Sequence, residues 1–147
     1  DVLPYRPDYC LFMVGGNNND CQNLRRILAD GELQALLERF AAELPAQTQA
    51  VGVVLNPVVD AWHFATSHPD YRDYLSTFDG SLDASFQPER DLARAFFTEQ
   101  NWPYLDLYEQ MHHAPENYVL REDGVHLNRS GHEFFARKMF DLLDDLL

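Results

Sequence analysis

The chain has 147 residues, of which 46% are hydrophobic, so it can bury the core of one domain covering residues 1–147. Its formal net charge of −13 repels phosphate backbones and anionic lipids, which argues against binding to nucleic acid or to a membrane surface. No apolar run approaches the roughly 18 residues that a membrane span requires.

Strands and helices alternate along the first half of the chain. The run Asp8–Val14 (DYCLFMV) is short, apolar and bounded by proline and glycine, which predicts a strand buried on both faces. A helical pattern covers Leu24–Leu28, restarts after Gly31 and stops before Pro45. The run Ala50–Pro57 (AVGVVLNP) predicts a second buried strand.

The second half begins with an aromatic segment, residues 58–87, in which only Pro69–Phe78 has a helical pattern. This segment either covers a functional site or packs as ordinary core. A helix is then expected from Pro88, a favoured first helical residue, to Gln100. The run Tyr104–Tyr108 predicts a third strand.

The chain closes with an amphipathic helix. Ser130 and Glu133 have the spacing of a capping box, which predicts a helix beginning at Gly131. Its apolar face consists of Phe135, Met139, Leu142, Leu143 and Leu146. The resulting order β-α-β-α-β-α predicts the α/β class, with a parallel sheet and helices on both of its faces.

Polar side chains follow the first and third of these strands. Asn17 lies in the loop GGNNND, and Asp123 and His126 lie in the loop that precedes the last helix. The carboxyl ends of parallel strands meet at one edge of a sheet, so we expect these three side chains to share one pocket. Each also has an ordinary structural role open to it, because Asn and Asp form turns and histidine bonds to backbone carbonyls.

Two segments resemble sequence blocks of the SGNH (GDSL-type) hydrolase family. RPDYCLFMVGGNNND is similar to the third block, with Gly15–Asn18 in the places of G-x-N-D. DGVHLNRSGHEFFA is similar to the last block, with Asp123–His126 as D-x-x-H. The resemblance implies a flavodoxin-like, three-layer α/β/α fold, of which this chain would hold the last three strands, and an ester hydrolase without cofactor or metal.

The resemblance also implies a role for each residue. His126 would take the proton of a nucleophilic serine, and Asp123 would orient the imidazole. Asn17 would stabilise the oxyanion that forms on the attacked carbonyl. In the family the serine belongs to a G-D-S block upstream of these segments, so we expect a missing amino-terminal segment or a companion chain to carry it. The internal candidate, Ser81 in FDGSLD, would require a permuted fold.

Other interpretations stay open at this stage. The chain could be a catalytically inactive binding module of the same fold, or Asp123 and His126 could bind a metal together with His112, His113 or His132. D-x-x-H also occurs at Asp60–His63, which shows how little one such motif specifies.

For the hydrolase, the expected substrate is a small acyl ester or an acylated glycan or lipid, met outside the cytoplasm. Cys10 is expected to pack in the core and Cys21 to be more exposed, with a disulfide between them left open.

Overall fold

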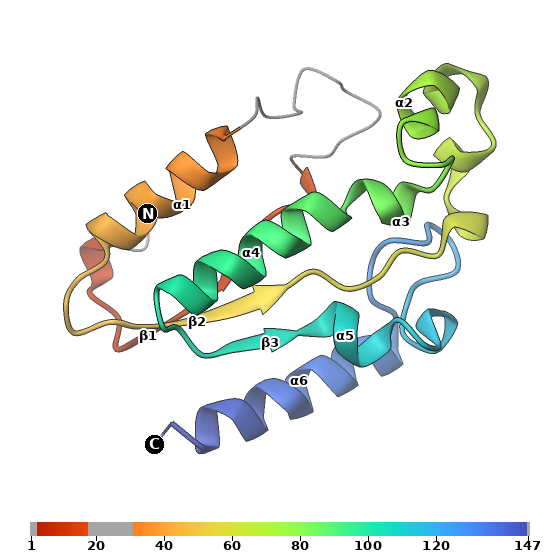
Figure 1. Ribbon diagram of the computed structural model, residues 1–147. Coiled ribbons are helices and arrows are strands. Elements are labelled where there is room, and N and C mark those ends of the chain that lie inside the picture. Colours follow the sequence, from red (N-terminus) through yellow and green to blue (C-terminus); the bar gives the residue numbers. More distant parts are fainter. Residues whose placement is uncertain (1–2, 18–30, 147) are drawn as a thin grey trace.

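Three parallel strands form one sheet in the order β1-β2-β3 (Figure 1). The computed structural model describes residues 3–17 and 31–146. The strands are β1 Tyr9–Met13, β2 Gln49–Val54 and β3 Tyr104–Asp106. The long helices are α1 Glu32–Glu43, α4 Gln87–Glu99 and α6 Arg129–Asp144. The short ones are α2 Arg72–Ser76, α3 Leu82–Ser85 and α5 Leu107–Met111.

Helices cover both faces of the sheet, as the sequence predicts. Helices α1 and α4 lie on one face, and α6 lies on the other (Figure 1). Strand β2 is buried on both faces: Val54 packs with the α1 and α4 side chains, and Val51 and Val53 pack toward α6. Gly52 lets α4 approach closely, because a Cβ there would meet the Phe97 ring at 2.5 Å. The chain is therefore a three-layer α/β/α domain.

Strand β1 differs from its prediction. Its side chains alternate in burial, and Tyr9, Leu11 and Met13 are exposed, so the strand is not buried on both faces. Their partners in the register include Val51 and Val53, which places them on the α6 face of the sheet. Among the described residues, no strand pairs with the outer edge of β1. An edge strand with one uncovered apolar face is a ready site for further pairing.

Two predicted boundaries are wrong because a polar side chain caps a helix. The third strand ends at Asp106, whose carboxylate accepts a hydrogen bond from the Glu109 amide and so begins α5. Helix α6 begins at Arg129 instead of Gly131, since the capping residue is Asn128 and not Ser130. The Asn128 side chain accepts a hydrogen bond from the Gly131 amide at 2.9 Å.

The remaining helical predictions divide into three groups. Helix α4 confirms the helix expected from Pro88, and the end of α1 before Pro45 is confirmed as well. The helix expected over Pro69–Phe78 is present as a 3₁₀ turn, Pro69–Tyr71, followed by α2. The helix expected over Leu24–Leu28 lies outside the described residues. Helix α3 had no sequence signal beyond its cap, Ser81.

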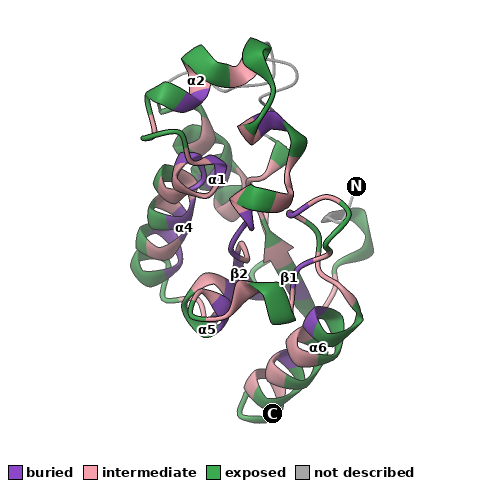
Figure 2. Ribbon diagram, turned by 90° about the vertical axis from the view of Figure 1, so that its right-hand side faces the viewer, coloured by how far each residue is buried: buried purple, intermediate pink, exposed green. Residues whose placement is uncertain are grey.

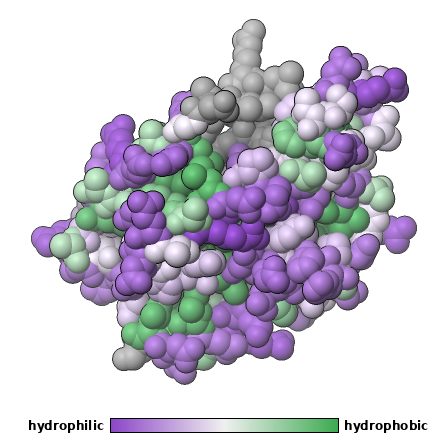
Figure 3. Space-filling view, viewed as in Figure 1, coloured by the Kyte–Doolittle hydropathy of each residue, from purple (hydrophilic) through white to green (hydrophobic). Residues whose placement is uncertain are grey.

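Hydrophilic residues cover most of the face in Figure 3, and apolar residues gather at the lower left, over the end of α6. Phe140, a residue of α6, is 68% exposed. None of the helices in the described ranges is long and apolar enough to cross a membrane. Cys10 is a buried, free thiol, and Cys21 lies outside the described residues.

Candidate functional site

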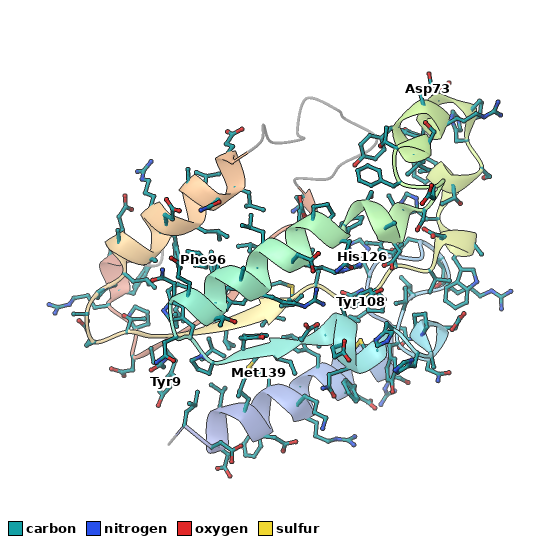
Figure 4. All side chains as sticks on the ribbon, viewed as in Figure 1. Tyr9, Asp73, Phe96, Tyr108, His126 and Met139 are labelled. Atoms are coloured by element: carbon teal, nitrogen blue, oxygen red, sulfur yellow. The ribbon has the colours of Figure 1, made fainter. Side chains whose placement is uncertain are left out.

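The loops that follow the three strands meet at the carboxyl edge of the sheet, which faces the viewer in Figure 2. A cavity of about 740 Å³ opens at this edge, and its walls include Asn17, Asp123 and His126. A cavity of this volume is large enough for a small-molecule ligand. In Figure 4, His126 lies at this end of the sheet and Tyr9, at the start of β1, lies at the other. The structure thus brings all three predicted site residues to one cavity.

Asp123 and His126 form a closely bonded pair. Asp123 Oδ2 lies 2.7 Å from His126 Nδ1, and Asp123 Oδ1 accepts hydrogen bonds from the amides of Val125 (2.8 Å) and His126 (3.0 Å). A carboxylate only accepts, so the neutral imidazole carries its proton on Nδ1 and presents the lone pair of Nε2. This is the tautomer that a general base requires.

The same hydrogen bonds keep Asp123 ionised. Partial burial raises the pKa of its carboxyl, but the bonds from Val125 and from the amide and imidazole of His126 outweigh burial and leave the pKa below its usual value. The aspartate is therefore an anion at neutral pH, able to stabilise a protonated His126.

A tight turn fixes the pair against the segment after β2. Gly124 has a φ of +71°, and its carbonyl accepts a hydrogen bond from the Val59 amide at 2.8 Å. A Cβ on Gly124 would stand 2.6 Å from the Val59 carbonyl oxygen, so both the backbone angle and the available space require glycine. On the other side, the Leu120 amide donates to the His126 carbonyl at 2.7 Å.

A buried arginine supports this turn indirectly, through hydrogen bonds to Asn56. The Arg90 side chain is 0% exposed, and its Nη2 donates to the Asn56 carbonyl (2.9 Å) and to Asp83 Oδ1 (2.7 Å). Its guanidinium also lies 4.3 Å from the centre of the Tyr108 ring. Asn56 in turn donates from Nδ2 to the Val125 carbonyl at 2.9 Å. These hydrogen bonds thus link α4 and the end of β2 to the loop that holds Asp123 and His126.

Asn17 reaches the cavity from the end of β1. Gly15 and Gly16 precede it with φ of +97° and +72°, and the Asn17 amide donates to the Gly15 carbonyl at 2.8 Å. Glu89 on α4 holds this turn, since its carboxylate accepts from the Gly16 amide at 3.0 Å. Burial raises the pKa of Glu89, although the bond from Gly16 and the charge of Arg90 oppose the rise. Asn18, the last residue of the G-x-N-D match, lies outside the described residues.

The His126 side chain is 79% exposed, so the mouth of the cavity is open beside it. Among the chain's serines, which are Ser67, Ser76, Ser81, Ser85 and Ser130, only Ser67 lines the cavity. The Ser67 hydroxyl donates to the Phe64 carbonyl at 3.1 Å. Ser81 has a structural role: it caps α3 and donates to Asp60 Oδ2 at 2.6 Å. The proposal of Ser81 as nucleophile is therefore not supported by its position.

The histidines weighed as metal ligands do not form a cluster. Within residues 3–17 and 31–146, no group of three or more His, Cys, Asp or Glu side chains could hold a metal ion. His112 and His113 lie ring against ring, with centroids 3.8 Å apart, and His112 Nδ1 bonds to the carbonyl oxygens of Tyr108 and Glu109. Of the three candidate partners, His132 lines the cavity and the other two do not.

Several residues that shape the site were not anticipated from the sequence. Arg90 lies on the buried face of α4 with Ala93 and Phe97, and a charged residue at such a position is a detectable signal of a buried network. Asn56 lies two residues after the end of the buried strand β2, and a polar residue at the carboxyl end of such a strand is also a usable signal. Glu89 has no comparable signal, because a surface glutamate in a first helical turn is common.

The described fold matches two solved ester hydrolases. A lipase/acylhydrolase from Enterococcus faecalis matches over 91% of this chain and 60% of its own, with a TM-score of 0.64 and 16% identity. An acetyl xylan esterase matches over 96% of this chain and 69% of its own, with a TM-score of 0.63 and 20% identity.

This chain therefore spans about 60% of the length of the first of these enzymes. At these identities the likeness establishes the fold alone, a three-layer α/β/α arrangement that this chain shares with both enzymes. Neither the known protein-family models nor the curated proteins include a match to the sequence.

Proposed function

We propose that this chain supplies the base, the orienting carboxylate and an oxyanion donor of a serine-type acyl ester hydrolase. The observation that carries the proposal is the 2.7 Å pairing of Asp123 with His126 at a cavity that Asn17 also lines. The fold, shared with a lipase/acylhydrolase and an acetyl xylan esterase, supports ester chemistry over other uses of such a pair.

In the proposed reaction, His126 Nε2 removes the proton of a serine hydroxyl as its oxygen attacks the ester carbonyl. Negative charge then collects on the carbonyl oxygen, where the Asn17 side-chain amide donates a hydrogen bond. The tetrahedral intermediate collapses, and His126 returns the proton to the departing alcohol. Water, activated by the same imidazole, then releases the acid from the serine. Asp123 holds the imidazole throughout and stabilises its protonated form.

The serine is proposed to come from an amino-terminal segment upstream of this chain or from a companion chain. In the part of the chain that the structure describes, the outer edge of β1 is unpaired, and such a segment would pair with this edge. It would also cover the exposed face formed by Tyr9, Leu11 and Met13. The serine of this segment would then lie beside His126, whose exposed side chain leaves room for it. The proposed substrate is a small acyl ester or an acylated glycan or lipid, and the proposed place of action is outside the cytoplasm.

The test is hydrolysis of p-nitrophenyl acetate by the complete protein, including any segment encoded before Asp1. His126→Ala should lower kcat by about a thousandfold or more. The matched control is His113→Ala, which removes an exposed histidine outside the cavity and should leave kcat within about threefold. Because His126 is exposed, both variants should melt like the unsubstituted protein.

Two outcomes would contradict the proposal. If the complete folded protein does not hydrolyse acyl esters of any chain length, a binding module of the same fold becomes the better account. If Ser67→Ala abolishes hydrolysis, the nucleophile lies within this chain and the proposed origin of the serine is wrong.

A further inference from the structure

His63 enters the same cavity from the segment after β2. It stands between two 3₁₀ turns, η4 Asp60–Trp62 and η5 Phe64–Thr66, and it lines the cavity that His126 also lines. Its backbone lies directly against the Gly124 turn, which holds Asp123 and His126, because a Cβ on Gly124 would stand 3.0 Å from the His63 amide nitrogen. Two imidazoles far apart in the sequence are thus brought to one cavity.

The two imidazoles have opposite tautomers. His63 Nδ1 accepts a hydrogen bond from the Ala65 amide at 3.2 Å, so the neutral ring carries its proton on Nε2. Burial lowers the pKa of His63, and the charges of Asp123 and Asp60 only partly oppose it, which keeps the ring neutral at pH 7. His126 therefore offers a lone pair at Nε2, and His63 offers an N–H.

The second D-x-x-H motif, Asp60–His63, does not form a second aspartate–histidine pair. Asp60 does not orient His63, since its Oδ2 accepts from the Ser81 hydroxyl at 2.6 Å and its Oδ1 accepts from the Asp83 amide at 3.0 Å. Within the part of the chain that the structure describes, no protein group accepts from His63 Nε2. Because no described protein group competes for this N–H, an oxygen of a ligand in the cavity can accept its hydrogen bond.

We propose that His63 Nε2 donates a hydrogen bond to the alcohol portion of the substrate and thereby selects esters whose alcohol carries a further hydroxyl or ether oxygen, as an acylated sugar does. This inference rests on the proposed ester hydrolysis. The departing alcohol is the part that receives its proton from His126, and His63 stands beside the turn that holds His126. An alcohol without a second oxygen leaves the donor unpaired and binds less well.

The neighbours of His63 suit a ring-shaped alcohol. Trp62 and Phe64 flank it in sequence and also line the cavity, and the Phe64 ring lies 4.8 Å from the imidazole. Aromatic faces of this kind pack against the apolar C–H surface of a ring, while the donor meets its oxygens. The wall formed by η4 and η5 therefore has both the apolar and the polar elements needed to bind a hydroxylated ring.

The experiment compares two acetate esters with similar six-membered rings, cyclohexyl acetate and a mono-acetylated methyl pyranoside, on the complete protein. His63→Asn removes the imidazole but keeps a side-chain acceptor for the Ala65 amide, so η5 stays capped. It should lower kcat/KM about tenfold for the pyranoside and less than about twofold for cyclohexyl acetate.

The matched control is His68→Asn. His68 caps the next 3₁₀ turn in the same way, accepting from the Asp70 amide at 3.3 Å, but it does not line this cavity. His68→Asn should leave kcat/KM unchanged for both esters. Equal losses on both esters with His63→Asn, or no loss on the pyranoside, would overturn the inference.

A binding measurement separates this inference from the hydrolase proposal. Adding the unacetylated methyl pyranoside should shift the His63 Nε2 resonance in ¹⁵N NMR spectra and leave that of His68 in place. If the protein hydrolyses neither ester, the hydrolase proposal fails. The shift of the His63 Nε2 resonance then tests by itself whether His63 donates to the sugar. A His63 resonance that does not respond to the sugar would overturn the donor site.

Discussion

Asn128 should be one of the most sensitive positions of the loop that carries His126. Its Oδ1 accepts from the Gly131 amide at the start of α6, and its Nδ2 donates to the carbonyls of Asn117 and Val119, both at 3.1 Å. The cap contributes about 1 kcal/mol. The two further bonds contribute roughly 1 kcal/mol each, so Asn128→Ala should destabilise the fold by about 3 kcal/mol.

The assay is urea unfolding followed by circular dichroism, with Asn128→Ser as an intermediate variant. Serine keeps the cap but loses both donated bonds, so it should cost about 2 kcal/mol. Ser130→Ala, at a position that only the sequence pattern favoured as the cap, should change stability by less than about 0.5 kcal/mol. A larger loss for Ser130→Ala than for Asn128→Ala would refute the assignment of the cap.

Three further predictions concern the site. Asn17→Ala should lower kcat about a hundredfold or more with little change in KM, because the donor acts in the transition state; steady-state kinetics showing only a raised KM would contradict this. Gly124→Ala should destabilise the protein by roughly 2–3 kcal/mol in thermal melts, since it strains a positive φ and crowds the Val59 carbonyl. Glu89 has a raised pKa, so its contribution to stability is fully present below its unfolded pKa of about 4.5 and is lost as the pH rises through the folded pKa. The melting temperature of the unsubstituted protein should therefore fall relative to Glu89→Gln between pH 4 and pH 8, and parallel curves would contradict the raised pKa.

The sequence predicts this fold well where a pattern is set by the core. The buried strand around Val51–Val54 and the helix opened by Pro88 follow from apolar periodicity and from proline, and both are found. The placement of Asn17, Asp123 and His126 at one cavity follows from strand order alone, because parallel strands share a carboxyl edge.

The errors and omissions arise where two local signals compete or where the outcome depends on tertiary contacts. Ser130 and Asn128 are both good caps, and the choice falls to Asn128 because its Nδ2 also bonds to two carbonyls that are distant in sequence. The alternating exposure of β1 depends on what covers its α6 face, which no local pattern reports. The role of His63 depends on its bond to Ala65 and on its contact with the Gly124 turn, and neither can be read from D-x-x-H spacing.

The central claim is that His126, held by Asp123, activates a serine supplied from outside these 147 residues. The most direct measurement is covalent labelling of the complete protein with a fluorophosphonate, followed by mass spectrometry of the labelled peptide. The account predicts one labelled serine on a segment outside this chain, at a rate that falls about a thousandfold or more in His126→Ala. Labelling at Ser67, or labelling that is as fast without His126, would contradict it.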